Sequence, residues 1–346
     1  KSNILPIVVM YLLFFMIAFV TNLCNPMAVI VKNNFAMSNF AAQLGNAANF
    51  IAYAAMGIPA GMLLKKIGYR KTALVAILIG FIGVFLQYMS GWAAIQSFWV
   101  YLAGAFTAGF CMCMLNTVVN PMLNTLGGGG NKGNQLVQFG GVCNSLAAVL
   151  VTIIMGSLIA DATKAQIADA TPALMIALGV FAFAFLVLLL VKIPEPAQEN
   201  EGDKAKDKKY SAFSFRHFNL GILAIFLYMG VEVGVPTYVM QYLTTSPDAT
   251  TPGLGINASI VGMIVAVYWL LMLVGRLLGG MIGGKVSSRA QITGVSVLCL
   301  ILVLLGMFLP TDVMVKMPGI DWATLTIMTA QVPVGVFALI LIGLCT

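Results

Sequence analysis

Charged residues are scarce in this sequence. Asp, Glu, Lys and Arg make up 8% of its 346 residues, against roughly a quarter in an average soluble domain. Hydrophobic residues make up 60%, and the mean hydropathy is +0.99. Too few polar side chains remain to cover a water-soluble domain, so the composition predicts an all-α polytopic membrane protein.

Histidine and paired cysteine are also scarce. The one histidine, His217, stands alone, and the six cysteines fall in apolar segments without the spacing of metal ligands. Nothing in the sequence offers a nucleophile together with a base. We therefore expect no enzymatic activity, no metal site and no cofactor. The net charge of +7 does not indicate nucleic-acid binding, because the basic residues stand in short groups between apolar runs.

Ten apolar runs are long enough to cross about 30 Å of hydrocarbon. They cover approximately residues 4–31, 40–64, 72–90, 96–125, 135–160, 172–192, 217–245, 257–283, 290–309 and 322–346. The sequence therefore predicts ten membrane-spanning helices.

Basic residues lie mostly on one side of these spans. If the amino terminus is cytoplasmic, fourteen Lys and Arg residues fall in inside segments, and only Lys32, Lys164 and Lys316 fall in outside loops. Cytoplasmic loops of membrane proteins carry such an excess of positive charge. We expect a multi-pass protein of the cell inner membrane with a cytoplasmic amino terminus.

One long hydrophilic stretch divides the spans. Residues 194–216 carry charges of both signs and few apolar side chains, a composition typical of a flexible linker. The sequence predicts an amino-terminal six-helix bundle at 1–193, a cytoplasmic linker at 194–216 and a carboxy-terminal bundle at 217–346.

The second half repeats part of the first. Three residues near the end of span two recur near the end of span eight at a constant offset of 219. They are Gly61, Lys66 and Arg70, repeated as Gly280, Lys285 and Arg289. Parallel repeats of this kind occur in transporters built from two six-helix bundles. The repeat calls for two spans more than this sequence holds, so four of six helices are expected in the second bundle.

Amides form the main polar feature of the spans. Asn116, Asn120 and Asn124 are four residues apart, which places them along one face of a helix. Such a stripe either lines a water-filled substrate path or holds neighbouring helices together. The prolines that follow Asn25 and Asn120 are expected to break their helices along the same path.

Ionisable residues are nearly absent from the spans. Of eleven acids only Glu232 lies in a span, and Arg276 is the only basic residue inside one. An intramembrane acid is a functional hypothesis by default. Three interpretations of Glu232 stay open. It forms a structural ion pair with Arg276, or it carries a proton, or it contacts the substrate directly. In the structural interpretation, Arg276 can instead extend toward the inner face of the membrane.

Several short segments carry a resemblance to a known family. In chain order they are NLCNP (22–26), KIGYRKT (66–72), LNTVVNPMLNTLG (115–127), CNSL (143–146), YMGVEV (228–233), VMQYL (239–243) and VGRLLGG (274–280). Together they resemble the fucose permease and glucose/galactose transporter family of the major facilitator superfamily. The resemblance implies the major facilitator fold of two six-helix bundles, with a substrate bound between them.

The resemblance also implies functional residues. In the superfamily, the loop after span two latches the bundles together, so a cytoplasmic gate is expected. The matching residues and their repeats are Gly61, Lys66, Arg70, Lys285 and Arg289. Lys65 stands where this loop usually has an acid.

Two departures from the family concern proton coupling. Its proton-coupled members carry an Asp near the position of Asn25 and a Glu at the position of Asn116. An amide still binds sugar hydroxyls but carries no proton near neutral pH. Glu232 and Arg276 are therefore the predicted coupling residues.

The sequence thus predicts a secondary transporter of a neutral monosaccharide such as fucose, glucose or galactose. Uniport and symport with a proton or sodium stay open, and a monomer in the lipid bilayer is expected. The predicted substrate-binding residues are Asn22, Asn25, Asn116, Asn120, Asn144 and, where relatives often carry Asn, Gln241. Two alternatives remain: a transporter of an amphipathic drug-like solute, and a non-transporting sensor with the same fold.

Overall fold

The computed structural model describes residues 4–158, 166–191, 193–195, 212–245, 247, 253–256, 258–283, 286–321 and 326–345. The first half holds α1 (Ile4–Asn34), α2 (Asn39–Ala42), α3 (Leu44–Ile67), α4 (Tyr69–Met89), α5 (Phe98–Leu126), α6 (Gly130–Leu158) and α7 (Thr171–Leu190). The second half holds η1 (Ala212–Ser214), α9 (Arg216–Thr244), α10 (Ala258–Ile282), α11 (Ser288–Phe308), β1 (Met314–Asp321), β2 (Thr326–Pro333), α12 (Val334–Leu341) and η2 (Ile342–Cys345).

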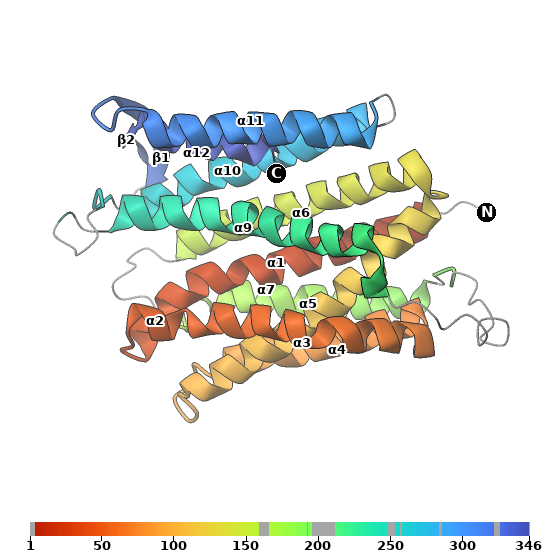
Figure 1. Ribbon diagram of the computed structural model, residues 1–346. Coiled ribbons are helices and arrows are strands. Elements are labelled where there is room, and N and C mark those ends of the chain that lie inside the picture. The colour runs from red at the N-terminus through yellow and green to blue at the C-terminus, as the bar shows by residue number, and fades with distance from the viewer. Residues whose placement is uncertain are drawn as a thin grey trace.

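The long helices lie roughly side by side, as Figure 1 shows. Nine helices of the described segments are long and apolar enough to cross a membrane. They confirm nine of the ten predicted spans and the all-helical membrane fold. Most of the predicted linker lies outside the described residues, so the domain boundaries at 193 and 217 stay predictions.

The tenth predicted span, at 322–346, is wrong. Residues 326–333 form strand β2, which pairs antiparallel with β1 from Met314 opposite Pro333 to Asp321 opposite Thr326. Helix α12 begins only at Val334, directly after Pro333. A proline inside a helix removes a backbone hydrogen bond, and the β-branched residues ahead of it favour a strand. The same apolar residues can form a membrane helix or a strand, so hydropathy alone did not distinguish the two.

The repeat is visible in the helix boundaries. The offset of 219 carries α4, Tyr69–Met89, onto α11, Ser288–Phe308, residue for residue. The same offset carries α5 onto residues 317–345, where the second half has most of the hairpin, α12 and η2 instead of one long helix. The two halves therefore correspond through α4 and diverge after it.

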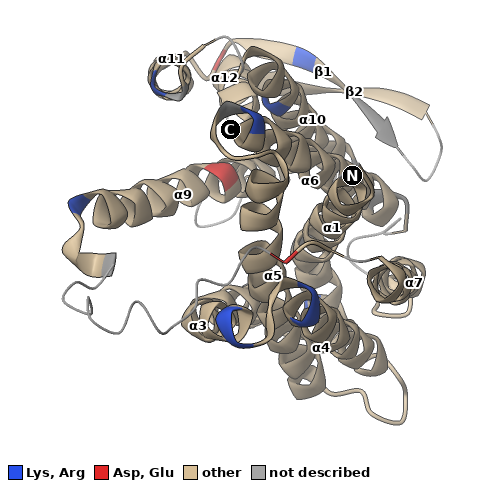
Figure 2. Cartoon of the chain, turned by 90° about the vertical axis from the view of Figure 1, so that its right-hand side faces the viewer, with Lys and Arg blue, Asp and Glu red and all other residues tan. Residues whose placement is uncertain are grey.

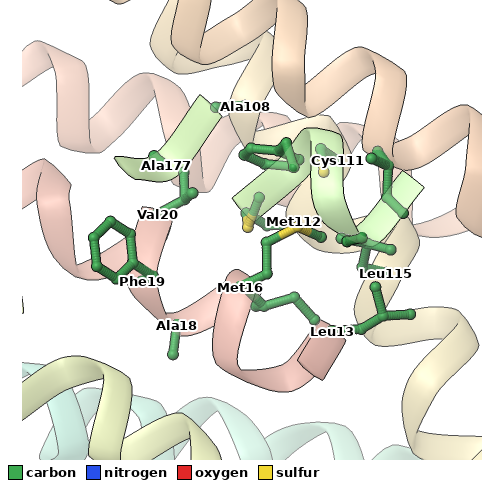
Figure 3. Close-up of a cluster of buried hydrophobic side chains, with 14 of the residues drawn as sticks. Leu13, Met16, Ala18, Phe19, Val20, Ala108, Cys111, Met112, Leu115 and Ala177 are labelled. Carbon is green, nitrogen blue, oxygen red and sulfur yellow. The ribbon is translucent and has the colours of Figure 1, made fainter. Parts of the chain in front are cut away.

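The core of the first half forms where α1, α5 and α7 meet. Figure 3 shows Leu13 and Met16 of α1 beside Met112 and Leu115 of α5, with Ala177 of α7 close by. All five side chains are at most 1% exposed. Lipid is as apolar as these side chains, so close packing, more than removal from water, stabilises such a core.

Glycines bring α4 and α5 into close contact. A Cβ on Gly83 would lie 2.6 Å from the main-chain nitrogen of Ala108, and one on Gly104 would lie 2.7 Å from the carbonyl oxygen of Gly83. No side chain larger than hydrogen fits there without moving a backbone. Small residues allow this approach between membrane helices.

The two halves meet where α6 packs against α10. Figure 2 looks along most of the helices and shows α6 between the helices of the first half and α10. Helix α9 lies to one side and packs against α10 and α12. Its outer face is apolar, with Ile225 and Phe226 at 65% and 73% exposure, as expected for a lipid-facing surface.

Gly83→Ala should lower the free energy of unfolding by about 1–3 kcal/mol, because the added methyl group must push α5 away from α4. Gly179→Ala in α7 is the matched control, since a Cβ there meets no atom within 4 Å. The midpoints of thermal unfolding in detergent measure both. Equal midpoints for the two variants would contradict this account of the α4–α5 contact.

Candidate functional site

The amides of α5 are hydrogen-bonded inside the first half. Asn116 donates from Nδ2 to the hydroxyl oxygen of Tyr53 in α3 at 3.0 Å. Asn120 donates from Nδ2 to the main-chain oxygen of Asn116 at 3.1 Å. Asn124, at the end of α5, lies against Gly133 of α6. The stripe therefore links α5 to its neighbours, while the side chains of Asn116 and Asn120 stay partly exposed.

A second polar contact lies between α1 and α3. Asn49 is 1% exposed, and its Nδ2 lies 3.3 Å from the sulfur of Cys24. Its Oδ1 is buried without a hydrogen-bond partner among the described residues. A Cβ on Gly109 of α5 would lie 2.7 Å from that oxygen. Tyr53 lies one helical turn further along α3, so both polar residues face the same neighbours.

The predicted residues of span one lie on α1. Asn22 donates from Nδ2 to the carbonyl oxygen of Ala18, one turn earlier, at 2.8 Å. Asn25 belongs to the same helix, but its side chain lies outside the described residues. Its position on α1 is all that the structure adds to the prediction.

The predicted helix breaks at the two Asn–Pro pairs are wrong. Helix α1 continues through Pro26 to Asn34, and α5 continues through Pro121 to Leu126. Each proline removes one donor from a helix of about thirty residues, and a membrane helix whose other bonds are intact tolerates that loss.

Asn144 and Gln241 stand on helices other than α5. Asn144 lies on α6 and is partly exposed, directly before the buried Ser145. Gln241 lies near the end of α9 with an exposed side chain. Of the six predicted substrate residues, the structure joins Asn116 and Asn120 by a hydrogen bond.

Glu232 and Arg276 form an ion pair. The guanidinium Nη2 of Arg276, on α10, donates to Oε1 of Glu232, on α9, at 3.0 Å, and the two side chains are 16% and 13% exposed. Nη2 also donates to the hydroxyl oxygen of Tyr228, one turn before Glu232, at 3.1 Å. The hydroxyl of Tyr268 donates to the main-chain oxygen of Glu232 at 3.2 Å.

The same guanidinium also contacts the first half. Its Nη1 donates to the carbonyl oxygen of Gly141 at 3.0 Å and to Oγ of Ser145 at 3.1 Å, both on α6. Arg276 therefore joins three helices. Sequence reasoning had paired Glu232 with Arg276 as one alternative but missed Ser145 and Tyr228. The spacing of four residues from Tyr228 to Glu232 was the available signal, since it places both on one helix face.

The predicted cytoplasmic gate residues have diverse surroundings. Arg70 bonds within its own half, donating from Nε to the carbonyl oxygen of Leu188 at 3.0 Å and from Nη2 to that of Leu189 at 2.7 Å. These are orphan carbonyls at the end of α7, so Arg70 caps that helix. Glu195 likewise accepts from the amide nitrogens of Tyr69 and Arg70 at the start of α4.

The other gate residues carry no contact between the halves that the structure describes. Gly61 lies on α3 in open space, Lys66 and Arg289 are exposed, and Lys285 lies outside the described residues. The latch between bundles stays a prediction.

The described surface includes the following two recesses. One, of about 230 Å³, is lined by Asn134, Val137, Gln138, Gln291 and Ile292. The other, of about 180 Å³, is an apolar groove between α4 and α7. Neither is lined by a predicted substrate residue. In the described part of the chain, no group of three or more His, Cys, Asp or Glu side chains is arranged to hold a metal ion.

These features define a polytopic α-helical membrane protein with repeated halves and a partly buried ion pair where the halves meet. Residues 10–345 match the Major Facilitator Superfamily. The chain belongs to that family, whose members are transporters and not enzymes.

Two relatives indicate the branch of the family. The chain is 30% identical over 274 residues to a glucose/galactose transporter of Brucella abortus, covering 78% of this chain and 64% of the relative. It is 23% identical over 337 residues to the L-fucose-proton symporter of Escherichia coli, covering 89% of this chain and 74% of the relative. The predicted resemblance to this group is thus confirmed, although the chain spans less than two thirds of the first relative's length.

A solved structure agrees with the fold. The chain superimposes on FucP, a major facilitator superfamily transporter in the outward conformation, with a TM-score of 0.75 and 20% sequence identity. The match covers 100% of this chain and 82% of FucP.

Tyr53→Phe should lower the free energy of unfolding by about 1–3 kcal/mol, because it leaves the amide of Asn116 without its acceptor inside the protein. Tyr238→Phe, on an exposed side chain of α9, is the matched control. Thermal unfolding of Tyr53→Phe, Asn116→Ala and the double variant measures the coupling. Strictly additive effects would show that the Tyr53–Asn116 bond does not contribute.

Proposed function

We propose that this protein is a secondary transporter that moves a neutral monosaccharide of the fucose, glucose or galactose type across the inner membrane by alternating access. The names of the relatives support the substrate class: one is a glucose/galactose transporter and the other an L-fucose-proton symporter. Membership of the Major Facilitator Superfamily supports transport between two bundles.

One observation carries the substrate proposal: the polar side chains that meet between α5 and α3 are uncharged. Asn116, Asn120 and Tyr53 offer donors and acceptors together, joined by bonds of 3.0 and 3.1 Å. A sugar hydroxyl needs both a donor and an acceptor, which amides supply. A charged substrate would instead need an opposite charge beside it. We assign the remaining substrate contacts to the other predicted amides, Asn22, Asn25, Asn144 and Gln241.

Glu232 is the proposed proton carrier. The family's acids near Asn25 and at Asn116 are amides here, and Glu232 is the only acid of the sequence that lies in a predicted span. Glu232 forms a partly buried ion pair with Arg276 at 3.0 Å. Neutralising Glu232 would leave the charge of Arg276 without its counterion, so the protonation state of Glu232 affects the neighbouring helix.

Further proposals concern the setting of the molecule. We propose that the amino terminus faces the cytoplasm, since fourteen of the basic residues would then lie inside. Residues 1–193 and 217–346 are proposed as the two bundles, working as a monomer. Gly61, Lys66, Arg70, Lys285 and Arg289 are proposed as a cytoplasmic gate.

Asn116→Ala should weaken sugar binding about tenfold, because a hydrogen bond to a sugar hydroxyl is lost in a partly buried site. Asn219→Ala, at the exposed start of α9, is the control. Displacement of labelled glucose, galactose or fucose from the purified protein measures both affinities. An unchanged affinity in Asn116→Ala would remove this residue from the substrate site.

Glu232→Gln should keep exchange of sugar across a proteoliposome membrane but abolish accumulation driven by a proton gradient, because a neutral amide cannot bind and release the proton. Glu195→Gln is the control and should keep both activities, because Glu195 only accepts hydrogen bonds from the start of α4. Counterflow and gradient-driven uptake of the same labelled sugar separate the two steps. Loss of exchange in Glu232→Gln would contradict the role of Glu232 as a proton carrier alone.

A further inference from the structure

One guanidinium group forms hydrogen bonds to both halves of the chain. Arg276 bonds through Nη1 to α6, at the carbonyl oxygen of Gly141 and at Oγ of Ser145, and through Nη2 to α9, at Tyr228 and Glu232. All four bonds are between 3.0 and 3.1 Å long. The group is therefore a bridge from the acid of the second half to the backbone of the first.

The local sequence of α6 is suited to receive this side chain. A Cβ on Gly141 would lie 3.0 Å from Cδ of Arg276, so a larger residue would crowd the arginine stem. Ser145 lies one turn further on the same face and is 0% exposed. Gln135 extends the contact along α6, donating from Nε2 to the carbonyl oxygen of Gly280 on α10 at 3.1 Å.

The bonds of Arg276 lie near the middle of α6 (Gly130–Leu158), and the Gln135–Gly280 bond lies closer to one end of the helices. The start of α6 and the end of α10 meet there, on the side of the amino terminus in Figure 1. With the proposed orientation that side is cytoplasmic. Parting α6 from α10 at this end would open a path between the halves on that side.

The charge of Glu232 decides how well the guanidinium is compensated. Arg keeps its proton at any ordinary pH. With Glu232 ionised, the buried cation has a counterion and two acceptors on α6. With a proton on a carboxyl oxygen of Glu232, the pair carries a net positive charge in a place of low dielectric, and an uncompensated buried charge is costly. The cation is then stabilised by moving toward water, and its bonds to Gly141 and Ser145 on α6 must break for it to do so.

The groups around Glu232 do not supply another counterion. From its own helix it faces Tyr228, and from α10 it faces Arg276 and Tyr268. Helix α12 and the 3₁₀ turn η1, which also pack on α9, contain no ionisable side chain. Among the described groups, Arg276 is therefore the one charged side chain that contacts Glu232, and protonation of Glu232 removes its counterion.

We propose that Arg276 is a positioning residue that clamps α6 to α10, with Gly141 and Ser145 as its receiving groups, and that protonation of Glu232 opens the clamp. The proposal rests on the proposed function, since it gives the proton on Glu232 a mechanical consequence. The step is proton binding alone: an O–H bond forms on the carboxylate and the proton comes from water in the path. Release of the proton restores the ion pair and closes the contact.

The test is the distance between the two helix ends in the intact protein. Spin labels are attached through non-natural amino acids at Lys132 on α6 and Met281 on α10, both exposed, so that the native cysteines stay in place. Distance distributions from pulsed electron paramagnetic resonance in nanodiscs at alkaline and acidic pH then report how much of the protein has the ends apart. The wild type should show a short distance at alkaline pH and a growing long component at acidic pH.

Variants make the clamp specific. Glu232→Gln, which mimics the protonated acid, should show the long component at both pH values. Ser145→Ala should raise the ratio of open to closed protein about tenfold, the effect of losing one hydrogen bond to a charged group, and should keep the pH response. Ser90→Ala is the control, because Ser90 is equally buried but bonds within the Gln87–Ser90 turn at the end of α4.

Two results would overturn the clamp: a pH response in Glu232→Gln equal to that of the wild type, or a Ser145→Ala distribution equal to that of Ser90→Ala. Sugar uptake measured on the same preparations separates this from the proposed function. Distances that respond as expected without sugar uptake would support the clamp and reject the sugar. Gradient-driven uptake with pH-independent distances would reject the clamp and leave the transporter proposal standing.

Discussion

Burial of a single guanidinium group constrains the middle of this protein. An arginine inside a membrane needs a counterion and acceptors for its five N–H groups, because nothing in hydrocarbon can replace water. Arg276 finds a counterion and three further acceptors on two other helices, with Glu232 and Tyr228 from α9 and Gly141 and Ser145 from α6. These bonds connect α6, α9 and α10, in addition to the packing of α6 against α10.

The packing of the other helices follows from their lipid surroundings. Lipid is itself apolar, so it does not drive apolar helix surfaces together as water does. Helices must then be held by close packing and by a few polar bonds. Gly83 and Gly104 bring α4 against α5, and the bond from Asn116 to Tyr53 ties α5 to α3. The first half is bound internally in this way, while its connection to the second half depends on the polar contacts of α6 with α10. The halves are thus firmly packed within themselves and joined to each other by a small set of polar bonds, which is the arrangement that the proposed alternating access needs.

Much of this fold could be predicted from the sequence, and particular residues show why the rest could not. Nine spans follow from apolar runs alone, and the offset of 219 predicts α11 from α4. Strand β2, at 326–333, was missed because its residues are apolar enough for a membrane helix, and only Pro333 and the β-branched residues before it point to a strand. The continuity of α1 through Pro26 was missed because the prediction considered the one backbone hydrogen bond that proline removes. It did not consider the intact backbone hydrogen bonds of the rest of the helix.

The site shows the same division. The residue types were predictable, since an acid and an arginine inside spans are rare enough to be singled out. Their partners were not, because Gly141 and Ser145 lie more than 130 residues from Arg276 along the chain and resemble ordinary packing residues. Long-range contacts of this kind depend on how the two halves meet, which no local pattern encodes.

Transport of a neutral sugar is the central claim, and uptake into proteoliposomes tests it most directly. Labelled glucose, galactose and fucose are offered to the protein with and without an inward proton gradient. The account predicts that at least one of them accumulates when the gradient is present and only equilibrates when it is absent. If none of the three enters vesicles that hold correctly folded protein, the claim is contradicted.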